Sequence, residues 1–577
     1  MPIHNADIAA VFEKIADLLE IESANPFRVR AYRNAARIVG ELGRDVKGMV
    51  EKGENLTGLP GIGDDLAGKI SEIVRTGTCG LLRKLERELP PAIAELLKVP
   101  GLGPKRVRAL WQELHVQTLD DLQRAAREGR IQALPGFGEK TQQNILEAVQ
   151  VRARAPGRML LAVASQYADG LVEHLSGISG VKRVVVAGSY RRGREMVGDL
   201  DILVTAAPGA EVMERFAAYD EVRELLSSGA TRASAVLKSG LQVDVRLVPE
   251  ESCGSALQYF TGAKAHNIEI RRLAQERGLK VNEYGVFRGT KRIAGETEES
   301  VYRAMEMPCI PPELRENQGE IEAAHRGLLP KLVDRDDLRG DLHLHTSASD
   351  GHNSLEEMAQ AGKQAGLAYL AVTEHSQRLK VARGLDPKRL LKHMEQVDRV
   401  NAGLDGVTLL RGVEVDILED GSLDLPDDVL GTLDLVVGAV HGKFNLSRAK
   451  QTERILRAMD HPYFSILAHP TGRMLGSREA MDVDWLRVVR KARQRGCFLE
   501  LNAQPERLDL PDSLCRMARD EGVLVSVASD AHSILDFAKL RFGVGQARRG
   551  WLERNDVLNT RPLKELKPLL RRTMGRR

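Results

Sequence analysis

The chain has few cysteines, few aromatic residues and no long apolar run. Its five cysteines include no Cys-x-x-Cys pair, which argues against a disulfide framework or a zinc ribbon and is typical of a reducing compartment. No run of about 18 apolar residues occurs, and the amino-terminal segment lacks a signal-peptide core. Aromatic residues make up only 4% of the chain, so stacking on long single strands is not the expected mode of nucleic-acid binding. We therefore expect a soluble cytoplasmic protein without a membrane segment.

The net charge of +3 hides an uneven distribution of charged residues. Lys and Arg gather in stretches such as residues 104–108, whereas acidic residues gather at candidate metal sites. Local charge therefore says more about binding partners than the mean charge does. A length of 577 residues is too great for one hydrophobic core, so three or more domains are expected.

Residues 1 to about 155 have helical periodicity and contain three apolar-Pro-Gly-x-Gly turns. Each turn exposes backbone N–H groups at the start of a helix, where a DNA phosphate binds well. Lys105 adds a positive charge in the second turn, and such contacts do not depend on base sequence. The pattern predicts tandem helix-hairpin-helix elements that bind DNA, the alternative being an ordinary helical scaffold with tight turns. The glycine pairs are Gly61 and Gly63, Gly101 and Gly103, and Gly136 and Gly138.

Residues 188–204 carry the most informative motif, GSYRRGREMVGDLDILV. Asp199 and Asp201 begin a strand, and because strand side chains alternate between faces, their carboxylates lie side by side. Residues 242–248 also alternate, so Asp244 joins the pair if the two strands are neighbours. Three carboxylates can hold two Mg²⁺ ions about 4 Å apart, as in-line phosphoryl transfer requires. The alternative for the first pair is an acidic strand end in a solvated turn.

These motifs resemble, in order and spacing, the X family of DNA polymerases over residues 1 to about 315. The resemblance implies that the three aspartates bind the catalytic metals, and it assigns further residues to the nucleotide. Ser189, Arg192 and Gly198 would hold the triphosphate, and Arg271 would sense the template side. The residues that would border the incoming sugar and base are Tyr259, Phe260, Gly262 and Asn267. The sequence departs from the family pattern at Gln242, Ala263, Lys264 and His266, which bears on sugar discrimination, fidelity and rate.

The same family can carry a deoxyribose-phosphate lyase in its amino-terminal domain. That chemistry needs a lysine amine to form a Schiff base, and Lys69 stands at the matching position. Tyr32 and Arg28 also resemble the lyase pocket. Asp65 stands where a second lysine would be, so a solvated helix lysine is the alternative interpretation of Lys69.

After Arg339, apolar strands and helices alternate, which predicts a parallel barrel or a doubly wound sheet. His343 and His345 lie on one face of a strand, and Asp350 follows in a loop. Because the carboxyl ends of barrel strands face a common mouth, the histidines and carboxylates that follow the other strands would meet there. Nine ligands are too many for one ion, and mixed nitrogen and oxygen ligation favours Zn²⁺ or Mn²⁺ over Mg²⁺. The remaining candidates are His375, Glu414, His441, His469, Asp530 and His532.

Residues from about 338 to 575 resemble the polymerase-and-histidinol-phosphatase (PHP) domain. All nine positions of that family's three-metal pattern are filled by the residues named above. The resemblance implies hydrolysis of phosphoesters with up to three Zn²⁺ or Mn²⁺ ions, and Arg473, near His469, is a candidate phosphate ligand.

The two resemblances together identify a bacterial-type family X DNA polymerase with a carboxy-terminal PHP domain. The expected architecture is multidomain α/β: helical helix-hairpin-helix domains, a nucleotidyltransferase palm with a mixed sheet and a helical thumb, and a distorted (β/α) barrel. The expected boundaries are a lyase-like domain at 1–95, fingers at 96–157, a palm at 158–252, a thumb at 253–316, a linker at 317–338 and a PHP domain at 339–577.

The implied function is filling of short gaps in DNA repair with two Mg²⁺ or Mn²⁺ ions at the polymerase site. The PHP domain would act as a 3′–5′ exonuclease, and abasic-site or 3′-phosphate cleavage is also suggested. Gapped or primer-template DNA and deoxynucleoside triphosphates are the implied partners, and a monomer is expected. Two alternatives are a template-independent nucleotidyltransferase acting on RNA or a small molecule, and a non-catalytic scaffold that binds DNA ends.

Overall fold

A computed structural model describes residues 5–22, 24–40, 42, 46–59, 61–89, 93–97, 99, 102–138, 142, 145 and 158–575. Gly101 is the one predicted site residue that lies outside these ranges. Among the described residues, no helix has the length and apolar character needed to cross a membrane. The chain forms two compact units, one of Met1–Met159, Val163–His174 and Met213–Val243, and one of Leu160–Ala162, Leu175–Val212 and Asp244–Arg577.

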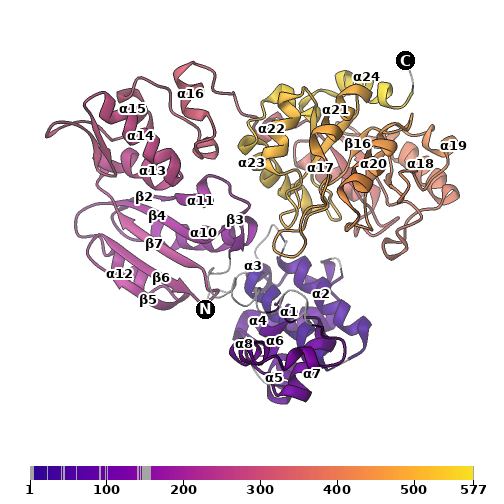
Figure 1. Ribbon diagram of the computed structural model, residues 1–577, viewed down its shortest axis with the longest axis horizontal. Coiled ribbons are helices and arrows are strands. Elements are labelled where there is room, and N and C mark those ends of the chain that lie inside the picture. Colours follow the sequence, from indigo (N-terminus) through magenta and orange to yellow (C-terminus); the bar gives the residue numbers. More distant parts are fainter. Residues whose placement is uncertain are drawn as a thin grey trace. The chain divides into compact units, whose positions relative to one another are not determined.

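The first unit begins with short helices, coloured indigo to purple in Figure 1. They are α1 (Asn5–Ile21), α2 (Pro26–Gly40), α3 (Val46–Glu51), α4 (Asp64–Thr76), α5 (Gly80–Glu88), α6 (Ile93–Leu96), α7 (Pro104–Leu114) and α8 (Leu119–Arg127). In α1, Ile8, Phe12 and Ile15 are fully buried and lie on one face, as helical spacing requires. Gly63 and Gly103 are the extended N-cap residues of α4 and α7, and neither has a side chain that could cap the helix. The first-turn N–H groups of these helices are therefore not capped by a side chain.

A five-stranded sheet follows, with strand order β2-β4-β7-β6-β5. β2 and β4 are antiparallel, with Val184 opposite Val204. The apolar half of β4 is buried, whereas its first residue is exposed, so the strand begins at an accessible edge. The strands are β2 (Val181–Val186), β4 (Asp199–Ala206), β5 (Val222–Ser228), β6 (Arg232–Leu237) and β7 (Gln242–Leu247). The neighbouring elements are β1 (Met159–Leu160), α10 (Leu161–Ser176), α11 (Gly188–Arg191), β3 (Met196–Val197) and α12 (Val212–Ala217).

Residues 253–325 combine helices with a small antiparallel sheet of order β10-β9-β8. The elements are α13 (Cys253–Thr261), α14 (Lys264–Glu276), β8 (Lys280–Asn282), β9 (Gly285–Arg288), β10 (Lys291–Ala294), α15 (Glu298–Ala304) and α16 (Glu320–His325). α16 falls inside the segment expected to be a linker. Its Ile321 and Ala324 are buried in the same apolar cluster as Tyr302 and Leu314, so this part of the segment is packed structure.

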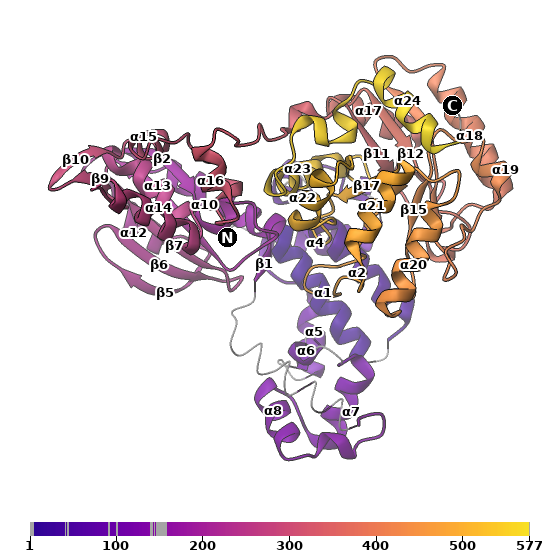
Figure 2. The ribbon, with the colours of Figure 1, turned by 45° about the horizontal axis from the view of Figure 1, so that its top comes forward.

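From residue 340 onward the strands are parallel and close into a distorted barrel, seen at the right of Figure 2. They form two sheets, β11-β12-β13 and β14-β15-β16-β17-β18. A bridge between His375 and Glu414 joins the sheets at one seam, and a bridge between Leu344 and Ala531 joins them at the other. The strands are β11 (Gly340–Leu344), β12 (Tyr369–Val372), β13 (Thr408–Arg411), β14 (Glu414–Asp416), β15 (Val437–Ala439), β16 (Ile466–Leu467), β17 (Phe498–Asn502) and β18 (Val525–Ala528).

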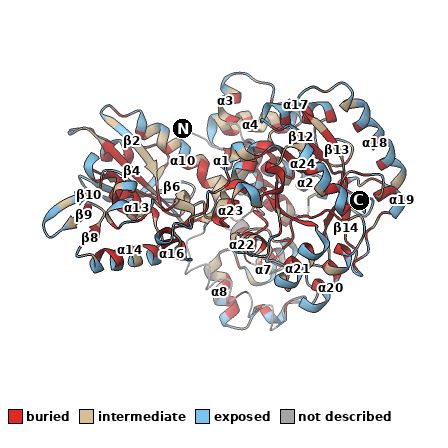
Figure 3. Cartoon of the chain, turned by 90° about the horizontal axis from the view of Figure 1, so that it is seen from above, coloured by how far each residue is buried: buried red, intermediate tan, exposed pale blue. Residues whose placement is uncertain are grey.

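Helices cover the outside of this barrel, and its strands are almost wholly buried, as the red of β12 in Figure 3 illustrates. The helices start at clear signals: Ser354 and Glu357 form a capping box before α17, and Asp386 caps α18. At α24, Leu566 and Leu570 pack in a cluster with barrel residues that include Leu342. The helices are α17 (Leu355–Gln364), α18 (Pro387–Asn401), α19 (Asp427–Leu430), α20 (Arg448–Met459), α21 (Trp485–Arg495), α22 (Asp512–Asp520), α23 (Leu540–Arg549) and α24 (Leu563–Thr573).

Candidate active sites

The three predicted aspartates lie on adjacent strands of the five-stranded sheet and form what we call the carboxylate edge: Asp199, Asp201 and Asp244. Asp199 and Asp201 begin β4, and Asp244 lies on β7, the next strand in the sheet. Burial, and then the charges of Asp199 and Asp244, raise the pKa of Asp201 to about 6. This mutual repulsion is what a bound cation relieves, so the carboxylate edge fits a divalent metal.

Gly188 packs directly against this edge. Its φ is +62°, and a Cβ atom built there would lie 2.5 Å from Oδ2 of Asp201. The backbone N–H of Ala187 also donates to the carbonyl of Asp201 at 2.7 Å. Only glycine satisfies both the left-handed conformation and the close approach, which explains the Gly-Ser turn before the D-x-D pair.

The predicted triphosphate residues lie on the turn formed by α11 and the loop after it. Arg192 donates from Nη1 to the carbonyl of Thr261 at 2.8 Å and from Nε to Glu316 Oε1 at 2.9 Å. Glu316 also accepts from Arg549 Nη1 at 3.1 Å. Ser189 lies in α11, and Gly198 directly precedes β4 with open space around its Cα. The sequence analysis did not single out Glu316 or Arg549, which hold this arginine in place.

A buried ion-pair network next to Arg192 was also missed by the sequence analysis. Arg191 makes a two-point contact with Glu298, at 2.8 and 2.7 Å, and Glu298 also binds the fully buried Arg315. Burial opposes ionisation of Glu298, but the two guanidinium groups hold its pKa below the ordinary value. The network therefore fixes α15 and the residues around Arg315 to the turn that contains α11.

The predicted sugar and base residues divide into two groups. Tyr259 and Phe260 form an edge-to-face pair at 5.1 Å, and Arg246, two residues after Asp244, lies over the Phe260 ring at 4.3 Å. These rings are therefore placed beside the carboxylate edge. Asn267 instead donates to the carbonyls of Tyr259 and Gly262, at 2.6 and 3.1 Å, and so closes the turn after α13.

Gly262 and Arg271, which were also predicted on this segment, differ in burial: the first is crowded and the second is exposed. Gly262 has no room for a side chain, because a Cβ would lie 2.6 Å from Oδ1 of Asn267. Arg271 is exposed and donates from Nε to the carbonyl of Asn267 at 3.2 Å. Its guanidinium thus points along α14 in this structure.

The helix-hairpin-helix turns differ in charge. Gly61 and Gly136 have positive φ values of +73° and +83°, and Gly63, Gly103 and Gly138 have open space where a side chain would be. α4 begins with two aspartates, whereas α7 begins with Pro104 and exposed Lys105. An anion is repelled at the first turn and attracted at the second, so the second turn is the better phosphate site.

Lys69 is paired inside its own helix. Its amine bonds Asp65 one turn earlier and lies 6.0 Å from the centre of the Tyr32 ring. Burial by itself would lower the pKa of Lys69, but the hydrogen bond that its amine donates to Asp65 keeps the pKa above the ordinary value. A protonated amine is not a nucleophile, so this pairing works against Schiff-base formation. The lyase role of Lys69 stays a prediction.

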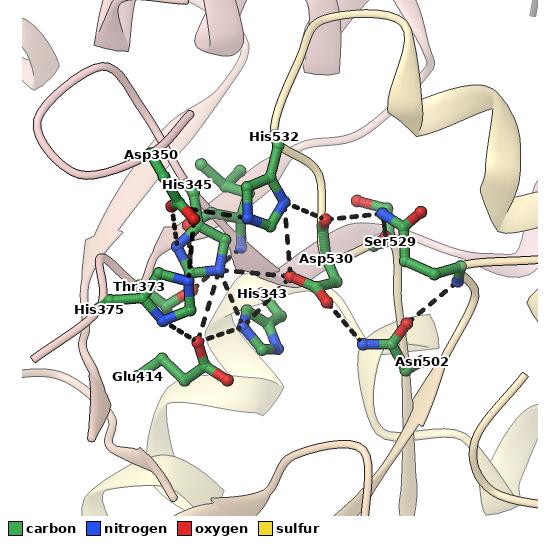
Figure 4. Close-up of polar contacts among 12 residues, drawn as sticks. His343, His345, Asp350, Thr373, His375, Glu414, Asn502, Ser529, Asp530 and His532 are labelled. Carbon is green, nitrogen blue, oxygen red and sulfur yellow. Dashed lines mark hydrogen bonds and ion pairs between the residues drawn. The ribbon is translucent and has the colours of Figure 1, made fainter. Parts of the chain in front are cut away.

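The nine histidines and carboxylates predicted in the carboxy-terminal half converge at one end of the barrel and are here called the barrel cluster. Figure 4 labels the members of the cluster other than His441 and His469. Three sets of ligand atoms lie within 4.8 Å of one another: His345, Asp350, His375 and His532; His343, His345 and Asp530; and His375, Glu414 and His441. His469 completes the cluster, because its Nε2 lies 2.9 Å from Glu414 Oε1. His345, His375 and Glu414 link the sets, so the three candidate metal positions are adjacent.

The chemistry of the barrel cluster fits bound metal ions. The Nε2 atoms of His343 and His345 face each other at 3.2 Å, and Asp530 Oδ1 lies 3.2 Å from the latter. Nδ1 of His345 and Nδ1 of His469 are buried without a hydrogen bond to any described residue. Burial, and then the charges of His375 and His532, lower the pKa of His345 to about 4, which keeps this imidazole neutral as a ligand must be. Buried polar atoms without partners are costly, and cations at these positions would satisfy them.

Two ligands sit in strained backbone conformations. His469 has a φ of +25° and Asp530 a φ of +51°, values that non-glycine residues rarely adopt. Such strain persists only where the surrounding structure imposes it, and it is concentrated at functional sites.

A second layer of buried polar side chains orients the residues of the barrel cluster. Nδ1 of His343 lies 2.6 Å from Glu500, and Nδ1 of His441 lies 2.9 Å from Asp416. Asn502 donates to Asp530 Oδ2 at 2.9 Å. These partners fix which ring nitrogen faces the cluster. The sequence analysis did not identify them, although Glu500 and Asp416 both lie on barrel strands.

Arg473 is not directed at the barrel cluster, contrary to the sequence-based expectation. Its guanidinium donates to Glu195 at 2.6 Å and to the carbonyls of Arg507 and Leu508. Arg507 and Leu508 lie in the loop that follows β17, and Glu195 lies in the loop between α11 and β3. These contacts link the loop after β16 to residues around Glu195, and phosphate binding by Arg473 stays a prediction.

Several family models match the chain. The helix-hairpin-helix domain model matches residues 3–79, and the SAM-like helix-hairpin-helix tandem matches residues 93–150. The DNA polymerase beta thumb matches residues 256–316, and the PHP domain matches residues 341–502. The fold and these matches define the class: a family X DNA polymerase with a PHP domain.

Similarity to a curated protein extends over the whole chain. The DNA polymerase/3′–5′ exonuclease PolX of Bacillus subtilis (strain 168) is 37% identical over 577 residues, which cover 99% of this chain and 100% of that protein. The chain belongs to the PolX family of DNA polymerase/3′–5′ exonucleases. The predicted family, fold class and type of enzyme are thereby confirmed.

The barrel also resembles smaller proteins. A probable phosphatase of Thermoanaerobacter sp. (strain X514) is 28% identical over 231 residues, covering 38% of this chain and 89% of that protein. A probable phosphatase of Acetivibrio thermocellus is 30% identical over 202 residues, covering 33% of this chain and 78% of that protein. The similarity covers most of the length of each probable phosphatase and about a third of this chain.

Proposed function

We propose that the chain extends primers at the carboxylate edge and removes nucleotides from DNA 3′ ends at the barrel cluster. The observation that supports this most is the existence of two separate ligand sets, one of three carboxylates and one rich in histidine. Hard oxygen ligands suit Mg²⁺, whereas mixed nitrogen and oxygen ligands suit Mn²⁺ or Zn²⁺. The two activities therefore use different side chains of the same chain.

At the carboxylate edge, Asp199, Asp201 and Asp244 hold two Mg²⁺ or Mn²⁺ ions. When bound, such ions neutralise phosphate charge and lower the pKa of the attacking 3′-hydroxyl. Ser189, Arg192 and Gly198 bind the triphosphate of the incoming deoxynucleotide, with Arg192 already oriented by Thr261 and Glu316. Tyr259 and Phe260 border its sugar and base. They help to position the nucleotide, and phosphoryl transfer depends mainly on positioning and charge neutralisation.

At the barrel cluster, the nine ligands hold up to three Mn²⁺ or Zn²⁺ ions. Bound ions there activate water and polarise the phosphoester. Glu500 and Asp416 hold His343 and His441 in the tautomers that ligation requires. The reaction releases nucleotides from a 3′ end, and cleavage at abasic sites or 3′-phosphates is a further use of the same hydrolytic site.

The helix-hairpin-helix turns bind the phosphates of gapped DNA without regard to sequence. Lys105 and the exposed start of α7 support this role. Holding DNA by its backbone suits an enzyme that fills short gaps during repair, because gaps occur in any sequence. The five free thiols suit the cytoplasmic location that we propose.

The test uses a 5′-labelled primer in a one-nucleotide gap, with Mg²⁺ or Mn²⁺, with and without deoxynucleoside triphosphates. Asp244→Asn is expected to abolish extension and to leave the Mn²⁺-dependent shortening of the primer intact. His343→Ala is expected to do the reverse. Glu322→Gln, at an exposed side chain that belongs to neither ligand set, serves as the matched control.

Loss of both activities in either variant contradicts two independent sites. Persistent exonuclease activity in a clean His343→Ala preparation contradicts the assignment of hydrolysis to the barrel cluster. Extension without a template strand would favour a template-independent transferase instead.

A further inference from the structure

The barrel helix α23 contacts the turn that carries the proposed triphosphate residues. This turn, residues 188–198, is called here the α11 turn, and it belongs to the same compact unit as α23. Nη1 of Arg549, the last residue of α23, donates to the carbonyl of Arg192 at 2.9 Å. The aliphatic part of the same side chain lies against Gly193, since a Cβ added to this glycine would be 3.7 Å from Cδ of Arg549. Gly193 has a φ of +65°, so the chain is in the left-handed conformation that glycine allows at the point of contact.

A second contact from the barrel holds the other end of the α11 turn. Glu195 accepts from Nη2 of Arg473 at 2.6 Å and from Nε2 of Gln546 at 2.5 Å. Gln546 is buried and lies on α23, three residues before Arg549. Barrel residues therefore hold the α11 turn at two places.

Glu316 is shared between the α11 turn and the barrel. Its Oε1 accepts from Nε of Arg192 at 2.9 Å and from Nη1 of Arg549 at 3.1 Å, and Nη1 of Arg194 lies 3.7 Å from the same oxygen. Burial by itself would raise the pKa of Glu316, but the charges of these arginines, that of Arg192 first, hold the pKa below the ordinary value. Glu316 is therefore ionised, and three guanidinium groups share its single charge.

This arrangement leaves Arg192 able to bind an anion. Its Nη1 donates to the carbonyl of Thr261 at 2.8 Å and its Nε donates to Glu316, whereas Nη2 takes no part in these two bonds. Arg549 also donates from Nη2 to Asp512 at 2.6 Å. The arginines around Glu316 thus outnumber the carboxylates that they share, so positive charge is left for a phosphate group. Guanidinium groups bind phosphate oxygens through strong, charge-assisted hydrogen bonds.

Glu316 and a phosphate compete for the same guanidinium group. Carboxylates and phosphates both bind arginine through two parallel N–H···O bonds. While Arg549 shares Glu316, Arg192 meets this carboxylate through Nε alone. Without Arg549, Glu316 would be free to rotate and to pair with Arg192 at two points. Such a pair would neutralise the arginine and occupy the nitrogen that a phosphate needs.

We propose that Arg549 of the barrel is a positioning residue for the polymerase reaction, because it holds Glu316 and so keeps Arg192 open to the triphosphate. The barrel is then a structural part of the nucleotide site in addition to carrying the barrel cluster. The inference rests on the proposed binding of the triphosphate by Arg192. It adds that affinity for the incoming nucleotide depends on a residue 357 positions further along the chain.

The test is a double-mutant cycle on nucleotide binding by the full chain. The DNA has a one-nucleotide gap, a dideoxy-terminated primer that cannot be extended, and 2-aminopurine as the template base. The fluorescence of this base reports the Kd of thymidine triphosphate in Ca²⁺ for the wild type, Arg192→Ala, Arg549→Met and the double variant. Arg549→Met is expected to raise the Kd about tenfold, a coupling typical of residues in contact. In the Arg192→Ala background the same substitution is expected to change the Kd less than about twofold, because the group through which it acts is gone.

Arg548→Gln is the matched control. Arg548 is the neighbouring residue on α23, and its Nε donates to Glu313 at 2.6 Å. Its substitution also removes an ion pair between α23 and the segment before Glu316, but it leaves Glu316 and Arg192 untouched. The Kd of this control is expected to equal that of the wild type. Cooperative urea unfolding verifies that each variant is folded, and Arg549→Lys, which keeps the buried charge, replaces Arg549→Met if the latter is not. A smaller rise in Kd is expected for the lysine variant.

Three outcomes overturn the proposal. Equal losses of affinity from Arg549→Met with and without Arg192 would mean that Arg549 does not act through Arg192. A Kd raised as much by Arg548→Gln would mean that any weakening of the contacts of α23 has the same effect. An unchanged Kd in Arg549→Met, when Arg192→Ala does weaken binding, overturns this inference and leaves the proposed function intact. If Arg192→Ala binds the nucleotide as well as the wild type, the proposed role of Arg192 is wrong and the inference fails with it.

Discussion

Replacing Gly188 with alanine tests whether the close approach at the carboxylate edge matters for synthesis. The new Cβ would lie 2.5 Å from Asp201 Oδ2, which is too close for two non-bonded atoms, and 3.4 Å from its Cγ. The carboxylate must therefore rotate or shift, and it cannot keep its present position beside Asp199 and Asp244. The substitution alters one ligand's placement without removing any charge.

Two separate effects are expected from this substitution. The left-handed φ of +62° costs an alanine about 1–2 kcal/mol, which lowers the free energy of unfolding. Displacement of a reacting group by about 1 Å can reduce the rate about 100-fold, so kcat/KM for gap filling should fall by at least that factor. Nuclease activity at the barrel cluster should be unchanged.

Gly289→Ala provides a matched control for the backbone effect. Gly289 has the same φ of +62°, but its added Cβ would meet no atom within 4 Å. It should lose similar stability, measured by urea unfolding, and retain normal extension, measured by single-turnover gap filling. If Gly188→Ala extends primers as fast as Gly289→Ala, the argument that glycine is required to place Asp201 is wrong.

Three further predictions concern DNA affinity, a buried charge and the metals. Lys105→Gln should reduce the slope of log affinity for gapped DNA against log salt by about 0.9, measured by fluorescence anisotropy, and an unchanged slope would remove the second hairpin from the DNA site. Glu298→Gln leaves the fully buried Arg315 without its charge partner and should cost about 3 kcal/mol of unfolding free energy. Glu322→Gln removes an ion pair that is exposed at both side chains and should cost less than about 0.5 kcal/mol of unfolding free energy. Equal losses for the two variants in urea unfolding would refute the distinction between the buried and the exposed ion pair. Chelation should lower the thermal unfolding midpoint, and Mn²⁺ at 100 times its Kd should restore about 2.7 kcal/mol; a midpoint that does not respond contradicts metal binding at the barrel cluster.

The sequence predicted that the nine residues of the barrel cluster would lie together, because two simple rules act together, and their role as metal ligands stays a prediction. Two histidines lie at the end of β11 and Asp350 in the loop after it, whereas the other six residues follow apolar runs, and parallel strands in a barrel bring their carboxyl ends to one mouth. Asp244 was predicted in the same way, since alternation on β7 and the neighbouring place of β4 suffice to bring it to Asp201. In both cases the local sequence pattern and the fold class together determine where the side chains come together.

The partners that hold these residues could not be predicted, because they are remote in sequence and have no local signature. Arg191 and Glu298 are 107 positions apart and His343 and Glu500 are 157 apart. Nothing in either segment indicates the other. The contacts of Asn267 and Arg473 were not predicted either: Asn267 donates to nearby carbonyl groups and Arg473 to Glu195, and their roles as ligand contacts stay predictions.

The spacing of the two ligand sets has a consequence for the order in which the enzyme acquires its activities. The carboxylate edge is complete within residues 199–244, whereas the barrel cluster joins His343 to His532, and its closing seam pairs Leu344 with Ala531. Contacts of such long sequence separation form late, because a large loop must close before any of them is gained. During synthesis the chain thus contains all three residues of the carboxylate edge before the barrel can close. We therefore expect the carboxylate edge to form before the barrel cluster in a newly synthesised chain.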